Sequence, residues 1–136
     1  MKPSTWMAFL AVGLTFNLAC DSDIRGTKPQ RTRDADGIIK LYRNREQGDW
    51  MLKGKVIQVE AAVVVDAPRG GPLTVAGRTS LTPIPIEVRY HKSEKGLGRL
   101  SPGDIITFKG IGAGMEGSIL FNSCVLISVF KRVPTS

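Results

Sequence analysis

The sequence predicts a mainly β protein with an N-terminal helix, folded as a five-stranded Greek-key barrel of the OB type. Three observations support this fold class. Apolar and polar residues alternate over several short segments, which is the period of a β-strand with one buried face. Fifteen Gly and eight Pro punctuate the chain into turns, and a single stretch has helical spacing. A half-open β-sandwich is the alternative that the same pattern allows.

The helix is expected at the start of the folded part, over residues 34–48. Its apolar face has the spacing i, i+3, i+4 and i+7: Ala35, Ile38, Ile39 and Tyr42. Asp34 or Asp36 can cap its first turn by accepting from free backbone N–H groups, and Gly48 is expected to end it.

The strands follow in chain order. They are expected at residues 56–65, 73–76, 84–90, 105–110 and 118–128. Pro85 has no backbone N–H to donate to a neighbouring strand, so the third strand lies at an edge of the sheet or begins after Pro85. The turn-rich residues 66–72 and the glycine-rich residues 112–117 are expected to be loops, and the last two strands to form the hairpin that closes the barrel.

The N-terminus predicts an exported chain. Residues 1–19 form a signal peptide of the lipoprotein type, with Lys2, an apolar run over residues 6–16 and a small residue before Cys20. Cys20 is then the expected lipidation site, carrying fatty-acyl chains such as palmitate. Asn17 stands where such signals usually have Leu, so an uncleaved anchor and ordinary cleavage that leaves a plain thiol remain alternatives. Asp21 slightly favours retention at the inner membrane of the bacterial cell envelope, facing the periplasm.

The chain between the signal and the barrel is polar and has no apolar period. Residues 20–33 are therefore predicted to be a flexible tether, and residues 34–132 the OB-fold domain. The net charge of +7 is spread along the sequence without a block of like charges. Such a diffuse excess favours anionic surfaces in general, whether membrane, polysaccharide or nucleic acid.

Several short motifs are similar to those of one known family. They are an Asn in the helix (Asn44), Asp49 before Lys53-Gly54-Lys55, Leu100 with Gly103-Asp104, Lys109-Gly110, and Cys124 in the last strand. Over about residues 38–127 the chain resembles the tRNA-anti-like family of OB-fold domains, which is found in short bacterial lipoproteins. The resemblance implies the fold and is not specific for an activity. Leu52 replaces a frequent Tyr of that family, and Ile111 a frequent second Cys, so no disulfide through Cys124 is expected.

Residues for catalysis are sparse, and the sequence predicts a protein that is not an enzyme. His91 is the one histidine, and it follows a strand in a charged stretch, where a solvated loop residue is expected. No His and Cys cluster has metal-ligand spacing, so neither a metal nor a cofactor is expected. Cys124 lies in an apolar strand without a basic neighbour, which favours a buried, inert thiol.

The sequence therefore predicts a membrane-tethered envelope lipoprotein whose barrel is a non-enzymatic binding module. Its partners would be the membrane, through the N-terminal lipid, and an envelope protein or an anionic glycan or lipid. The expected binding surface comprises Arg69, Arg78, Arg89, Trp50 and Lys92. The alternative is single-stranded nucleic-acid binding, for which Trp50 and Phe121 are the candidate stacking residues. It is disfavoured because an exported protein meets little nucleic acid.

Overall fold

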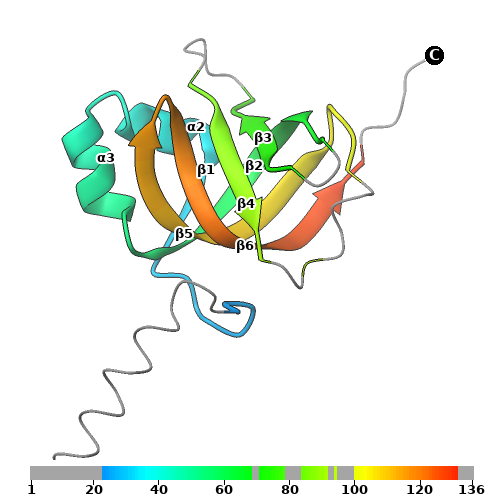
Figure 1. Ribbon diagram of the computed structural model, residues 1–136, viewed down its shortest axis with the longest axis horizontal. Coiled ribbons are helices and arrows are strands. Elements are labelled where there is room, and N and C mark those ends of the chain that lie inside the picture. The colour runs from blue at the N-terminus through cyan, green and yellow to red at the C-terminus, as the bar shows by residue number, and fades with distance from the viewer. Residues whose placement is uncertain (1–22, 69–70, 79–83, 92–93, 95–99, 132–136) are drawn as a thin grey trace, which may run out of the picture.

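The computed structural model describes residues 23–68, 71–78, 84–91, 94 and 100–131 (Figure 1). The elements in chain order are β1 (Arg31–Asp34), α2 (Ala35–Leu41), α3 (Arg45–Leu52), β2 (Val56–Asp66), β3 (Leu73–Ala76), β4 (Ile86–Tyr90), β5 (Ile105–Glu116) and β6 (Ser118–Phe130). The signal peptide and Cys20 lie outside the described residues.

Five strands close into a barrel. The order β2-β3-β4-β6-β5 returns to β2 through pairing of β2 with β5, and β4 runs parallel to β6 while the other barrel pairs are antiparallel. This connectivity is that of an OB-type Greek-key barrel, so the predicted fold class is confirmed. β1 pairs in parallel with the first half of β2 and forms an extra edge strand.

The long strand β2 pairs with β5 and, because it bends in its middle, also with β1 and then with β3. Ala61 has a φ of 52°, and the register with β5 shifts between Val59 and Ala62. A bulge of this kind kinks a strand and increases its twist. The first half of β2 therefore pairs with β1, and the second half, from Val63 onward, pairs with β3.

The barrel interior is filled by inward-facing side chains of the strands and helices. Strict alternation from Ile57 and Val59 would bury Val63 and Val65 as well, but the phase changes at the bulge of β2, so Ala62 and Val64 are buried instead and Val65 is exposed. The largest fully buried residues come from every barrel strand and from both helices: Phe108, Phe121, Ile38, Ile39, Leu52, Ile57, Leu73, Ile86, Ile106 and Ile119. The rings of Phe108 and Phe121 meet edge to face with centroids 5.7 Å apart, a favourable arrangement for aromatic quadrupoles. Phe121 is fully buried, so its prediction as a stacking residue is wrong.

The single predicted helix is two helices. Tyr42 ends α2, and Asn44 starts α3 by accepting the backbone N–H of Gln47 on its side-chain oxygen at 3.2 Å. Gly48, predicted to end the helix, lies buried inside α3. A Cβ on Gly48 would fall 2.6 Å from the Tyr42 ring, so this glycine makes room for the ring.

The closing hairpin is tighter than predicted. Residues 112–116 continue β5 instead of forming a loop, and the turn is made at Gly117, whose φ of 75° suits glycine. The prediction of a loop over residues 112–117 is therefore wrong.

The predicted tether is also wrong for its described part, residues 23–33. Ile24 is 3% exposed, and residues 31–33 belong to β1. The folded domain therefore begins at least eleven residues before the predicted boundary at residue 34.

Candidate functional site

The surface on which OB barrels usually bind ligands is the outer side of β3 and β4. The antiparallel register places Thr74 opposite Glu87, and these side chains alternate with the buried Leu73, Val75 and Val88. Arg89 lies two residues beyond Glu87 on the same outward side and is exposed, and its Nε donates to Glu87 Oε2 at 2.6 Å. An exposed pair of this kind is weakly bound, so an anionic ligand could compete for the guanidinium.

Arg78 follows β3 and lies near the start of α2. Its backbone N–H donates to Asp36 Oδ2 at 3.1 Å, and the neighbouring Gly77 lies so close to Asp36 that a Cβ there would overlap the carboxylate. The Arg78 side chain is exposed and has no ion-pair partner among the described residues.

The structure does not bring Arg78 and Arg89 together. In the β3–β4 register, Thr74 faces Glu87, so Arg89 lies at one end of this strand pair and Arg78 beyond the other. The two are separated by about six residue steps along the pair, roughly 20 Å at the rise of a strand. They can contact one extended ligand but cannot form one compact anion site.

Trp50 lies in a third place, on α3, which packs beside β5. Its side chain is 73% exposed, the highest value among the large apolar residues of the described chain. Lys55 Nζ lies 5.4 Å from the ring centroid and donates to the Trp50 carbonyl oxygen at 3.1 Å. The ring therefore carries a cation at its face, an arrangement suited to an aromatic or anionic group.

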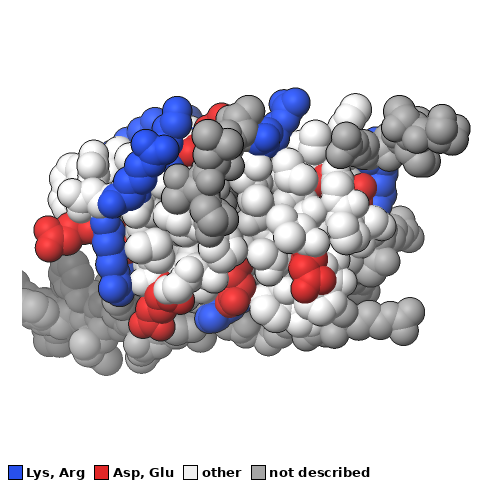
Figure 2. Space-filling model, turned by 90° about the horizontal axis from the view of Figure 1, so that it is seen from above, with Lys and Arg blue, Asp and Glu red and all other residues white. Residues whose placement is uncertain are grey.

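Arg69 and Lys92 lie outside the described residues, so the predicted binding surface is placed only for Trp50, Arg78 and Arg89. The described residues hold thirteen Lys and Arg and eleven Asp and Glu. On the face drawn in Figure 2, acidic groups lie among the basic ones. The described surface is thus mixed in charge.

A buried polar group that the sequence did not indicate lies where β4 meets β6. His91, predicted to be a solvated loop residue, is 9% exposed, and its backbone N–H donates to the Cys124 carbonyl oxygen at 2.9 Å. That bond extends the β4–β6 pairing by one residue beyond Tyr90 and Cys124. His91 is therefore a buried residue at the end of a strand, and its prediction as a solvated loop residue is wrong. The Tyr90 hydroxyl is buried with no hydrogen-bond partner among the described residues. Burial raises the pKa of Tyr90, which keeps the phenol neutral at physiological pH.

Cys124 is fully buried and carries a free thiol. Burial raises the pKa of Cys124 well above its usual value, because a thiolate would lose its hydration there. The thiolate is the reactive form of cysteine, so Cys124 has the properties of an inert core residue, as the sequence predicts.

We expect Cys124 to react with iodoacetamide only when the barrel opens. In a Cys20→Ser chain, which retains one cysteine, alkylation of the native protein should be slower than in 6 M guanidinium chloride by at least about two orders of magnitude. Mass spectrometry of timed samples measures both rates. Equal rates would show that Cys124 is accessible in the native barrel.

Among the described residues, no group of three or more His, Cys, Asp or Glu side chains could hold a metal ion. Within the same residues, no helix is long and apolar enough to cross a membrane. Compared with protein-family models, with curated proteins and with solved structures, the chain matches none of them.

Proposed function

We propose that this protein is a bacterial envelope lipoprotein, anchored through Cys20, whose barrel is a non-enzymatic binding module. The observation that carries the proposal is the order of residues at the N-terminus: Lys2, an apolar run over residues 6–16, and Ala19 directly before Cys20. An acylated N-terminal cysteine with several chains would hold a protein firmly at a membrane, unlike a single chain.

The barrel supports a binding role through its exposed basic and aromatic side chains. Arg78 and Arg89 lie at the two ends of the β3–β4 pair, and Trp50 projects from α3 with Lys55 at its ring. Because these groups are far apart, the partner best suited to them is extended: an anionic glycan, or a protein segment with spaced acidic groups. Their charges favour an anionic partner and increase the rate of encounter at low salt.

The intact mass of protein purified from membranes tests the anchor. We expect a chain that begins at Cys20 and carries a diacyl or triacyl modification. The Cys20→Ser variant should show neither the acyl mass nor tight membrane association, because the acceptor sulfur is gone. An unmodified wild-type chain in the soluble fraction would overturn the proposal.

Single-stranded nucleic-acid binding is the second candidate, and the exposure of Trp50 is the observation that favours it. Stacking platforms of this kind normally occur as several aromatic residues along a basic groove, whereas Phe108 and Phe121 are both buried here. Titration with single-stranded DNA at two salt concentrations distinguishes the candidates, since binding through phosphates weakens steeply with salt.

A further inference from the structure

Residues 23–30, here called the N-terminal strap, are bound to the barrel although they directly follow the predicted lipidation region. The strap makes a turn in which the Thr27 N–H donates to the Ile24 carbonyl oxygen at 3.0 Å. Ile24 is 3% exposed, so its side chain is shielded from water. Removing an apolar side chain of this size from water is favourable, so it helps to hold the strap in place.

Lys109 binds the strap from β5. Its side chain is 6% exposed, and its ammonium donates to the carbonyl oxygens of Arg25 at 2.8 Å and Thr27 at 2.7 Å. A buried ammonium is costly unless it is hydrogen-bonded. The two strap carbonyls therefore supply bonds that Lys109 needs, and releasing the strap would remove both.

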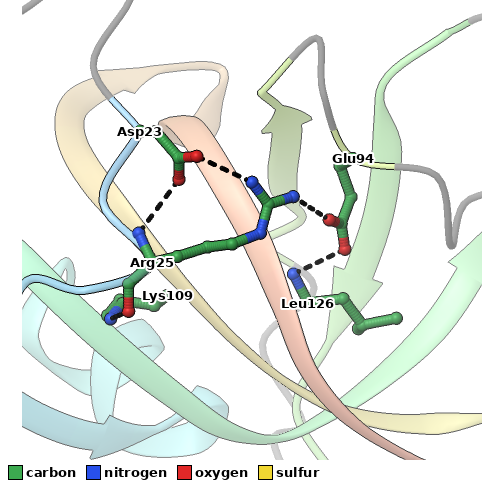
Figure 3. Close-up of polar contacts among 5 residues, drawn as sticks. All are labelled: Asp23, Arg25, Glu94, Lys109 and Leu126. Carbon is green, nitrogen blue, oxygen red and sulfur yellow. Dashed lines mark hydrogen bonds and ion pairs between the residues drawn. The ribbon is translucent and has the colours of Figure 1, made fainter.

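Glu94 links Arg25 of the strap to Leu126 of β6 (Figure 3). Arg25 Nη2 lies 2.7 Å from Glu94 Oε2, and the other Glu94 oxygen accepts the Leu126 N–H at 3.0 Å. Asp23 accepts from both the backbone N–H and the guanidinium of Arg25 at 3.1 and 2.8 Å. The Glu94 side chain is 9% exposed and the Arg25 side chain 43% exposed, so the carboxylate of this pair is shielded from water while the guanidinium is partly hydrated.

The end of the strap passes directly into the edge strand. The Gln30 N–H donates to the Val56 carbonyl oxygen at 2.8 Å, and the Val56 N–H donates to Gln30 Oε1 at 3.0 Å. The next residues pair in register with β2 as β1. The strap is thus fixed at both ends, and no free chain separates Ile24 from the barrel.

This attachment shortens the reach of a lipid on Cys20. From Cys20 to Ile24 the chain has four residue steps, at most about 14 Å when fully extended. A tether running to Arg33 would reach about 47 Å. A domain of this size is roughly 30 Å across, so the longer tether would let it turn freely and the shorter one would not.

We propose that the N-terminal strap holds the barrel directly against the lipid bilayer in one orientation, with the strap side toward the membrane. This inference rests on acylation of Cys20. β1 runs from the strap across the barrel to α2, which lies on the opposite side in Figure 1. The membrane-distal side then comprises the start of α2 and the adjoining Arg78, whose exposed side chain would face an envelope partner.

The test compares two exposed lysines replaced by cysteine and labelled with a donor fluorophore. Lys28→Cys lies in the strap, and Lys40→Cys lies on α2. The acylated chain, with its mass verified, is placed in vesicles of phosphatidylcholine and phosphatidylglycerol that contain a headgroup-labelled acceptor lipid. We expect more energy transfer from position 28 than from position 40.

Lys109→Met in the same labelled chains should narrow the difference between the two positions, because a barrel that the strap no longer holds can turn relative to the bilayer. Lys131→Met is the matched control: it also removes one lysine charge, from an ion pair with Asp104, and should leave the difference intact. Ile24→Ser releases the strap independently should Lys109→Met fail to fold. Equal transfer from positions 28 and 40 in the acylated wild-type chain would overturn the orientation alone, whereas a missing acyl mass would overturn the proposed function.

Discussion

Phe108→Ala is expected to lower the free energy of unfolding by about 3–5 kcal/mol. Phe108 has no exposed surface, and its ring meets that of Phe121 from the opposite side of the β5–β6 hairpin, with an angle of 75° between the ring planes. Removing the ring creates a cavity that the closed barrel can fill only in part. Urea denaturation followed by circular dichroism measures the loss.

Phe130→Ala is the matched control, because Phe130 lies at the end of β6 and is 66% exposed. Its effect should stay within about 0.5 kcal/mol. A loss of 3–5 kcal/mol is a large part of the stability of a small domain, so Phe108→Leu serves as a milder variant that still folds. If Phe108→Ala and Phe130→Ala have equal effects, Phe108 does not occupy the barrel core.

The strands were predictable because a local pattern encodes them. Alternation with period two is visible in β2, β3 and β4, and their observed bounds lie within about two residues of those expected. The barrel closure is less local: it depends on the bend at Ala61, where a non-glycine residue adopts a positive φ. No composition signal marks such a position.

The prediction of a single helix over residues 34–48 failed because it did not recognise the N-cap of a second helix. Asn44 is a strong N-cap residue, and it divides the apolar pattern into α2 and α3. Gly48 is a common helix terminator, but here the tertiary contact with the Tyr42 ring requires a residue without a side chain. The hydroxyl of that ring donates to Asp49 at 2.9 Å, so one packing arrangement explains three of the conspicuous residues in this segment.

The tether prediction failed because the contacts that hold the strap are remote in sequence. Lys109 is separated from Arg25 by 84 positions, and Glu94 by 69. A polar segment with Gly and Pro looks the same whether or not such partners exist. The signal that could have been used is Lys109 itself, a lysine beside Gly110 in an otherwise apolar strand.

The candidate site was predicted by residue type but not by arrangement. Trp50, Arg78 and Arg89 are exposed as expected, yet they lie on α3 and at opposite ends of the β3–β4 pair. Their separation follows from a strand register that the sequence did not specify.

Several residues on which the predicted resemblance to tRNA-anti-like domains rests have structural roles in this chain. Asn44 caps α3, Lys109 binds the strap, and the Asp104 carboxylate accepts from the Ser101 N–H at 2.8 Å and from Lys131 Nζ at 2.6 Å. Burial alone would raise the pKa of Asp104, but these two donors stabilise the carboxylate and lower it. Residues that maintain a fold do not identify a ligand, so the family resemblance, which stays a prediction, leaves the activity open.

Gly112→Ala is expected to destabilise the domain by about 1–3 kcal/mol, toward the upper end of the cost of overpacking. A Cβ on Gly112 would lie 2.8 Å from the carbonyl carbon of Leu52 and would overlap its oxygen. The obstacle is backbone, which cannot rotate away as a side chain can. The same segment is fixed by the Gly54 N–H, which donates to the Gly112 carbonyl oxygen at 2.8 Å.

The substitution should also move α3 away from β5, and Trp50 on that helix offers a second measurement. We expect a changed Trp50 fluorescence spectrum together with a lower midpoint in urea, because the ring and Lys55 are both positioned by this contact. Gly26→Ala is the matched control, since nothing lies within 4 Å of a Cβ at that position, and it should cost no stability. If Gly112→Ala is as stable as Gly26→Ala, the backbones of α3 and β5 do not meet at Gly112, and Trp50 is held in place by other contacts.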